Sequence, residues 1–237
     1  MANWNLEKLS TASYNTSSYD IAEAYNNISI TADTADITLE LSRQGKTAVT
    51  CFEQTNMTHS VAVEDGTLVI RANDTRKWYE HFGIFLKKPQ ITLSLPQGKY
   101  DSLVICSNTG DITIPEHFAF GAMNLTAHTG DVWNQASVSG ELTIKTTTGN
   151  IHMKNLSAGT IALSVTTGNI SASSIICGSD FTLIATTGDT VLDHVQCKSL
   201  TVNGKTGKLS LINVIAEDTF NATRSTGDVS FSECDAG

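Results

Sequence analysis

Apolar and polar residues alternate along much of this chain, and the alternating pattern returns at a fixed interval. Residues 141 to 190 repeat one phrase three times: an alternating apolar run, Thr-Gly, Asp or Asn, and a second alternating run. A fixed interval of roughly 20 residues is typical of a solenoid, in which each repeat forms one layer of a coil. Over the whole chain the phrase supplies seven evenly spaced Thr-Gly pairs, with glycines at Gly110, Gly130, Gly149, Gly168, Gly188, Gly207 and Gly227.

Aligning the repeats on this glycine places the apolar residues in columns. Such alternation, with many β-branched residues, predicts strands that each bury one face. We expect the threonine before each glycine to continue the alternation inward. Each repeat is therefore predicted to form a strand, a glycine turn, a second strand and a corner. Seven residues before the glycine lie Leu103, Met123, Leu142, Ile161, Phe181, Leu200 and Phe220; two residues after it lie Ile112, Val132, Ile151, Ile170, Thr190, Leu209 and Val229.

The residue after each glycine is usually Asp or Asn. A sharp turn needs a residue at positive φ, which glycine supplies without steric cost, and a short polar side chain beside it bonds nearby backbone. Stacked carboxylates would also suit a hard cation, but each repeat offers only one such side chain and Lys208 interrupts the row. We interpret the column as structural and predict no metal site: Asp111, Asp131, Asn150, Asn169, Asp189, Lys208 and Asp228.

One repeat is too short to bury a core of its own. Stacking lets neighbouring repeats share backbone hydrogen bonds and a continuous apolar interior. The sequence therefore predicts an all-β fold, a single-stranded β-helix or β-solenoid with one repeat, about 20 residues, in each rung. A right-handed coil is expected, because crossovers between parallel strands favour that hand.

The repeats divide the chain into regular and irregular parts. Residues 1–26 are predicted to be an N-terminal cap or tether, and residues 27–237 the solenoid. Residues 27–39 match the repeat with Ala35 in the glycine position, and 100–237 form the regular rungs. We expect 27–99 to form irregular rungs, because the stretch from Ala35 to Gly110 is close to four repeats long. Within them, residues 61–70 read as two strands about a tight turn.

Residues 74–88 are the part of the chain least like a repeat. This insertion concentrates aromatic and basic residues, which suit a protruding binding loop. They also suit an insertion that folds over an exposed sheet edge, and we favour this second interpretation. The segment is nevertheless the first candidate site for a partner, through Trp78, Tyr79, Phe82, Phe85, Lys87 and Lys88.

Composition and residue spacing argue against several classes of function. With 15 basic and 24 acidic residues, the net charge of −9 argues against nucleic-acid binding. No apolar run is long enough to span a membrane and no signal peptide is recognised. The six histidines share no ligand spacing, and no catalytic motif or cofactor site emerges. Five cysteines lack a CxxC spacing. Cys177 and Cys197 fall on adjacent rungs, where they read better as small buried residues than as a disulfide.

The repeat, together with a front end of the type ISITADTADITLE and EDGTLVIRAND followed by ITLSLP, resembles a bacterial β-strand-repeat family known as adhesins of unknown function. The resemblance covers residues 27 to the end and carries over no catalytic residue. It implies a cell-surface protein that is membrane-anchored in its full-length form.

From this resemblance and the repeats we expect a non-enzymatic surface solenoid acting in adhesion, envelope sensing or as an interaction scaffold. The alternative is a carbohydrate-active enzyme or a glycan-binding β-helix. Expected partners are a protein, a cell-surface glycan, or a second copy joined end to end or along a sheet edge.

Overall fold

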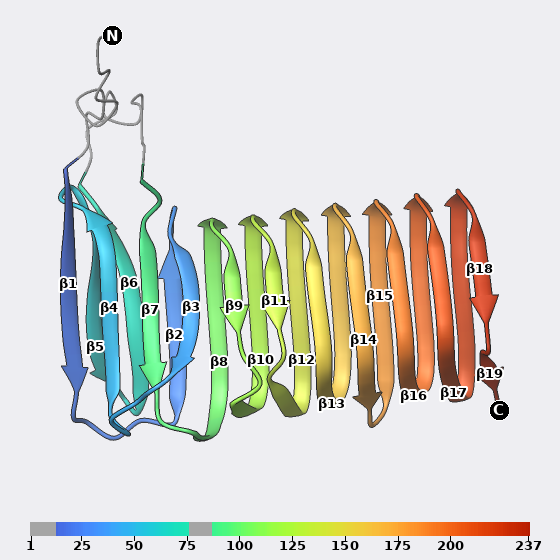
Figure 1. The fold of residues 1–237 in the computed structure, drawn as a ribbon, viewed down its shortest axis with the longest axis horizontal. Helices are drawn as coiled ribbons and strands as arrows, with labels where there is room; N and C mark the ends of the chain where they lie inside the picture. The colour runs from blue at the N-terminus through green and yellow to red at the C-terminus, as the bar shows by residue number, and fades with distance from the viewer. Residues whose placement is uncertain (1–12, 76–86) are drawn as a thin grey trace, which may run out of the picture.

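The computed structural model describes residues 13–75 and 87–237. They form strands stacked into one elongated coil (Figure 1). This confirms the all-β solenoid predicted from the repeats. Within these residues no helix is long and apolar enough to cross a bilayer. The first strands are β1 (Tyr14–Ile21), β2 (Asn27–Ala32), β3 (Asp36–Leu41), β4 (Thr47–Gln54), β5 (Met57–Glu64), β6 (Thr67–Asp74) and β7 (Gln90–Leu95). The regular rungs comprise β8 (Gly98–Thr109), β9 (Ile112–Ile114), β10 (Phe118–Thr129), β11 (Val132–Asn134), β12 (Ser137–Thr148), β13 (Ile151–Thr167), β14 (Ile170–Cys177), β15 (Asp180–Thr187), β16 (Thr190–Thr206), β17 (Leu209–Thr226), β18 (Val229–Ser232) and β19 (Asp235–Ala236).

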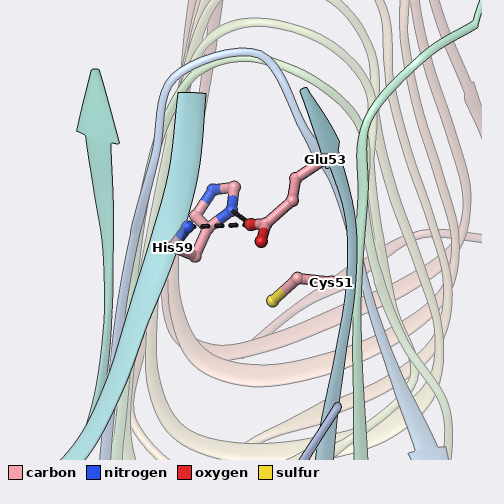
Figure 2. A group of neighbouring side chains, drawn as sticks. All are labelled: Cys51, Glu53 and His59. Atoms are coloured by element: carbon pink, nitrogen blue, oxygen red, sulfur yellow. Dashed lines mark hydrogen bonds and ion pairs between the residues drawn. The ribbon is translucent and has the colours of Figure 1, made fainter. Parts of the chain in front are cut away.

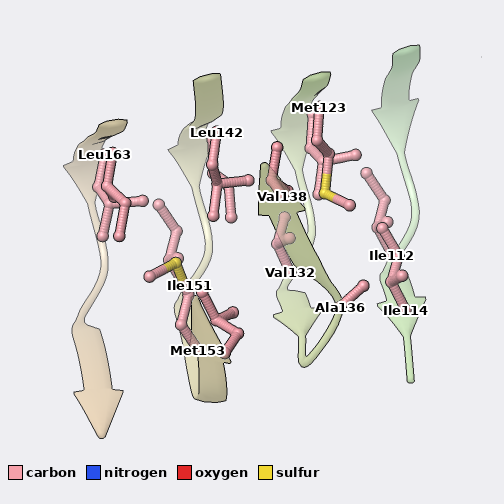
Figure 3. Packing of buried hydrophobic residues seen from close by; sticks show 14 of the residues in the cluster. Ile112, Ile114, Met123, Val132, Ala136, Val138, Leu142, Ile151, Met153 and Leu163 are labelled. Carbon is pink, nitrogen blue, oxygen red and sulfur yellow. The ribbon is translucent and has the colours of Figure 1, made fainter. Parts of the chain in front are cut away.

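The regular rungs stack in parallel and in register. Leu142 pairs with Ile161, and Ile161 pairs with Phe181, so the apolar columns of the sequence are columns of the structure. Strands before the glycine form one layer of the coil and strands after it form the facing layer. The core lies between the layers (Figure 3) and runs without interruption from Ile28 to Ala216. Each rung thus buries its neighbour's apolar face, as a solenoid requires.

In the seven repeats that carry Thr-Gly, the turn between the two layers admits only glycine. The seven repeat glycines have φ between +119° and +144°, a region that other residues rarely enter. A Cβ atom at any of them would lie 1.9 to 2.2 Å from the carbonyl oxygen of the corresponding residue one rung earlier. The turns therefore stack so closely that conformation and space both demand glycine. At the first glycine, Gly110, that oxygen belongs to Ala35.

The threonine beside the glycine does not point inward as expected. All seven are exposed, because the chain already bends at the last inward residue, two positions earlier, such as Ala127 or Val165. A second corner lies six residues after the glycine, where five rungs hold a non-glycine residue in the left-handed region with φ between +50° and +56°. All five residues at this position are polar, and two are asparagine, whose short side chain tolerates this region: Asn155, Ser174, His194, Asn213 and Glu233.

The irregular rungs are not stacked in chain order. The length of the stretch from Ala35 to Gly110 suggested successive rungs between these two residues, and the structure corrects that expectation. β2 and β3 pair directly with β8 and β9, so no rung lies between these two residues. β6 and β7 instead form a rung on the far side of β2 and β3. Beyond it, β4 and β5 pair antiparallel with β7 and β6. After β3 the chain therefore forms two further levels of the coil, on the side of β2 and β3 that faces away from the regular rungs, and then returns to the regular rungs at β8. β5 and β6 form the hairpin that was predicted from residues 61–70.

Different contacts are found at the two ends of the described coil. At the N-terminal end, β1 pairs antiparallel with β4 and covers that edge of the sheet (Figure 1). At the other end, Arg224 occupies an inward position above Gly204, where only glycine leaves room for it. Its guanidinium donates hydrogen bonds to the carbonyl oxygens of Ala185, Gly188 and Lys208. These hydrogen bonds tie Arg224 to the two preceding turns of the coil.

Candidate functional site

The insertion joins β6 to β7, which pair with β2 and β3, so in the chain it takes the place of the turn that joins β2 to β3. Four of the predicted binding residues, Trp78, Tyr79, Phe82 and Phe85, lie outside the described residues. Lys87 contributes its carbonyl oxygen to a hydrogen bond from the Tyr14 hydroxyl at 2.8 Å. The binding-loop hypothesis therefore stays a prediction.

Lys88 is engaged by the coil itself. Its Nζ lies 2.5 Å from Asp36 Oδ1 and 3.5 Å from Asp111 Oδ2. Burial lowers the pKa of Lys88, but the hydrogen bond and negative charge of Asp36, with the charge of Asp111, raise it overall. The lysine thus neutralises two carboxylates at the start of the Asp and Asn column, and its ammonium group is committed to the fold.

The Asp and Asn column forms a ladder along the turn edge. Asp111 Oδ1 accepts a hydrogen bond from the backbone N–H of Asp131 at 2.9 Å, and Asp131 Oδ1 accepts one from Asn150 at 2.7 Å. The pattern continues to Asp189 Oδ1, which accepts from the N–H of Lys208 at 2.7 Å. These side chains bond the next rung rather than their own turn. Each of these side chains gives a backbone N–H of the next rung its hydrogen-bond acceptor, which is a structural role.

A groove on the outer face of the second layer is a candidate binding site. Trp133 on β11 and His152 on β13 pair on adjacent rungs, with ring centroids 5.4 Å apart and planes 11° from parallel. Trp133 remains 37% exposed. The groove has a volume of about 520 Å³. Its lining is aromatic, hydroxyl, amide and ammonium: Thr113, Trp133, Asn134, Gln135, His152, Met153, Lys154, Ser171 and Ser173.

Sequence reasoning missed this pair although the signal was present. Both residues lie three positions after a repeat glycine, so the repeat spacing alone superimposes them. Asn134 supports the groove from inside the coil, because its side chain accepts from the N–H of Ala136 and donates to the carbonyl of the same residue. The Trp133 backbone thus lies between the paired strands of both neighbouring rungs, and its ring stacks on His152.

A second cluster lies inside the irregular end of the coil. Cys51 and Glu53 project from β4 and His59 projects from β5, and all three side chains point into the space between the layers (Figure 2). Glu53 Oε2 accepts hydrogen bonds from the His59 backbone N–H at 2.8 Å and from His59 Nδ1 at 2.9 Å. The Ser17 hydroxyl on β1 donates to Glu53 Oε1 at 2.9 Å. The cluster therefore links β1, β4 and β5 through buried polar groups.

The spacing of the six histidines did not reveal this cluster, because only one of its members is a histidine. Cys51, Glu53 and His59 offer thiol, carboxylate and imidazole atoms that all lie within 4.8 Å of one another. Burial, reinforced by the Glu53 carboxylate, raises the pKa of the Cys51 thiol to about 12. The β4–β5 turn creates the arrangement, which repeat columns could not show. Its sequence signal was Glu53 at an inward position of β4, two residues after Cys51 and four after Val49.

Comparison with known proteins places the fold. No curated protein is significantly similar in sequence. A putative adhesin from Bacteroides fragilis shares 19% identity with a TM-score of 0.52, over 95% of this chain and 97% of that one. A putative lipid binding protein from Parabacteroides distasonis shares 15% identity with a TM-score of 0.51, over 94% and 96%. At such identities the likeness shows the fold alone.

The family is shown by the sequence itself. A family model described as Toastrack DUF4097 matches residues 25–235, which include both the irregular and the regular rungs. The match agrees with the resemblance to adhesins of unknown function that the repeat phrase and its front end indicated. This chain belongs to the Toastrack DUF4097 family.

Proposed function

We propose that this protein is a non-enzymatic scaffold at the bacterial cell surface and that it binds saccharides through the groove at Trp133 and His152. Adhesion or sensing of envelope glycans would follow from that binding. The surface location is supported by the coil architecture and by the name of the Bacteroides fragilis neighbour, a putative adhesin.

The exposed Trp133 ring is the observation that carries the proposal. A flat indole face on a rigid strand offers the apolar faces of a sugar ring a stacking platform. Around it, Gln135, Lys154 and Ser173 supply donors and acceptors of the kind that hydroxyl groups need. The ring is fixed by its stack on His152, so little conformational entropy is lost when a ligand binds.

The groove favours binding over catalysis. Glycoside hydrolysis usually needs a pair of Asp or Glu side chains flanking the bond that breaks. The residues that line this groove include no carboxylate. Lys154 and His152 supply positive or neutral hydrogen-bond donors instead, which suit saccharide hydroxyls and the acidic groups of envelope polymers.

A glycan array followed by titration calorimetry tests the proposal. We expect wild-type chain to bind at least one class of bacterial or host saccharide, and Trp133→Ala to weaken that binding at least about tenfold, since a stacked aromatic contributes on the order of 1–3 kcal/mol. The matched control is Val191→Ala, because Val191 lies in the same outward column at the same 37% exposure, three rungs away.

Three results would overturn the proposal. One is equal saccharide binding by the wild type and Trp133→Ala. Another is release of products from a polysaccharide, which would favour the enzyme alternative. The third is binding of phospholipid vesicles but of no saccharide, which would favour the activity named for the Parabacteroides distasonis neighbour.

A further inference from the structure

We propose that Cys51, Glu53 and His59 form a binding site for a divalent transition-metal ion, with Zn²⁺ the ion that the donor set fits best. The site lies in the irregular end of the coil, away from the groove at Trp133. It is independent of the saccharide proposal.

The geometry places three different donors around one point. The candidate ligand atoms are Cys51 Sγ, a Glu53 carboxylate oxygen and His59 Nδ1, all within 4.8 Å of one another. In a tetrahedral zinc site, bonds of about 2.0 to 2.3 Å put the ligand atoms roughly 3.2 to 3.8 Å apart. His59 Nδ1 and Glu53 Oε2, now 2.9 Å apart, would separate slightly, and the thiol would move in. Side-chain rotations on two adjoining strands suffice for both changes.

The charges also balance. A thiolate and a carboxylate together neutralise a dication, and the imidazole binds as a neutral ligand, so the occupied site carries no net charge. Neutrality matters here, because Cys51 is 0% exposed, Glu53 2% and His59 3%. On binding, the thiol proton would leave to solvent, and the His59 proton that now bonds Glu53 from Nδ1 would be given up and replaced by one on Nε2, so that the imidazole stays neutral. A mixed sulfur, nitrogen and oxygen set suits Zn²⁺ better than Ca²⁺ or Mg²⁺, which prefer oxygen alone.

The first described strand supplies part of an outer shell, on the Glu53 carboxylate and the His59 backbone, while His59 Nε2 is buried without a hydrogen-bond partner among the described residues. Glu53 already receives the Ser17 hydroxyl at 2.9 Å, and the Tyr19 hydroxyl donates to the His59 carbonyl at 3.2 Å. Both contacts come from β1, so the first described strand covers the site. Groups of this kind hold metal ligands in position and exclude competing water. A bound ion would fasten β4 to β5 beneath β1, and three protein donors leave one further position for a small ligand such as water.

Metal binding is tested on the untagged full chain after treatment with a chelator. One equivalent of Zn²⁺ or Co²⁺ is added, unbound metal is removed by dialysis, and retained metal is counted by mass spectrometry. We expect close to one ion per chain and, for Co²⁺, a thiolate-to-metal charge-transfer band in the near ultraviolet. Cys51→Ala should abolish the band and weaken binding at least about tenfold. Cys197→Ala, which removes an equally enclosed thiol outside the cluster, should change neither.

A second variant keeps the test decisive if Cys51→Ala does not fold. Replacing Cys106, Cys177, Cys197 and Cys234 by alanine leaves Cys51 as the only thiol. The core should accept this, because Ala158 and Ala216 already occupy the column of Cys177 and Cys197. The charge-transfer band should persist in this variant. Absence of the band, or no retained metal in the wild type, would overturn the proposal.

Discussion

At the scale of single residues, the fold is fixed by positions that accept only one kind of side chain. The repeat glycines combine a φ of +119° or more with contact to the backbone of the preceding rung. The inward columns demand apolar side chains, and the ladder position demands a short acceptor. The same conformational and packing requirements return in each regular rung, and the sequence repeats for that reason.

Replacing Gly168 by alanine tests the glycine requirement. A Cβ atom there would lie 2.0 Å from the Gly149 carbonyl oxygen at a φ of +144°. We expect the free energy of unfolding to fall by about 3 kcal/mol or more, from backbone strain and steric overlap together. Urea denaturation measures it. Gly178→Ala is the matched control, because its nearest atom would be 3.6 Å away, and it should change stability by less than about 0.5 kcal/mol. Equal effects of the two variants would contradict the argument.

The cysteines should differ in reactivity according to burial. Burial, with the nearby Cys177, Glu217 and Asp180, raises the pKa of Cys197 to about 12 from an ordinary value of 9.0. We therefore expect a thiol reagent at pH 8 to modify the exposed Cys106 rapidly and Cys197 only after unfolding. Peptide mapping by mass spectrometry distinguishes the sites, and rapid native-state modification of Cys197 would count against a closed core.

The same shift links Cys197 to stability. The folded chain holds this proton more tightly than the unfolded chain does. Its contribution to stability is therefore complete below a pH of about 9 and is lost as the pH rises toward about 12.

At the scale of elements, each rung is held to the next by backbone pairing and by the Asp and Asn ladder. The ladder explains why the column after the glycine tolerates both Asp and Asn: each offers an Oδ1 acceptor to the N–H one rung later. Lys208 offers none, and the ladder ends at that rung.

Removing one ladder acceptor should have a measurable cost. In Asp131→Ala, the Asn150 N–H loses its 2.7 Å partner and the Asn150 amide loses its 3.1 Å partner. We expect a loss of about 1–2 kcal/mol in thermal or urea denaturation. Asp131→Asn keeps the acceptor and should stay within about 0.5 kcal/mol of the wild type. A loss of the same size in Asp131→Asn would mean that the carboxylate charge, not the hydrogen bond, matters.

At the scale of the whole molecule, the two ends of the described coil carry different contacts. β1 lies on β4 at one end, and Arg224 reaches back over the last turns at the other. Phe231, 54% exposed, and Val229, 41% exposed, remain on that second end. End-to-end association through such residues stays a prediction, which sedimentation at increasing concentration checks.

Arg224 should stabilise the C-terminal rungs locally. It gives hydrogen bonds to three carbonyl oxygens and to the Thr190 hydroxyl, at 2.8 to 3.4 Å. We expect Arg224→Ala to speed hydrogen exchange in β16 and β17 by roughly tenfold, corresponding to about 1.4 kcal/mol, while exchange in β8 to β12 is unchanged. Arg224→Lys should rescue only part of the loss, because an ammonium group cannot reach all four acceptors. Unchanged exchange in β17 would show that the contacts add nothing.

Much of this architecture could be read from the sequence, and the exceptions have physical reasons. The glycine turns, the inward columns and the β5–β6 hairpin follow from local rules of conformation and alternation. The order of the irregular rungs does not, because β2 and β6 meet only after the chain has turned back on itself. The cluster of Cys51, Glu53 and His59 was missed for the same reason. The pairing of Trp133 with His152, in contrast, could have been predicted from the repeat spacing.

The stacking of rungs in register is the claim on which the coil and the groove at Trp133 depend. Pulsed electron paramagnetic resonance between spin labels on exposed residues of one column measures it directly. His128 and Lys205 lie four rungs apart and His128 and Ser225 lie five rungs apart, each two residues before a repeat glycine. At about 4.8 Å per rung, we expect separations of roughly 19 Å and 24 Å. Separations that do not increase with the number of rungs would contradict the coil and the groove placed on it.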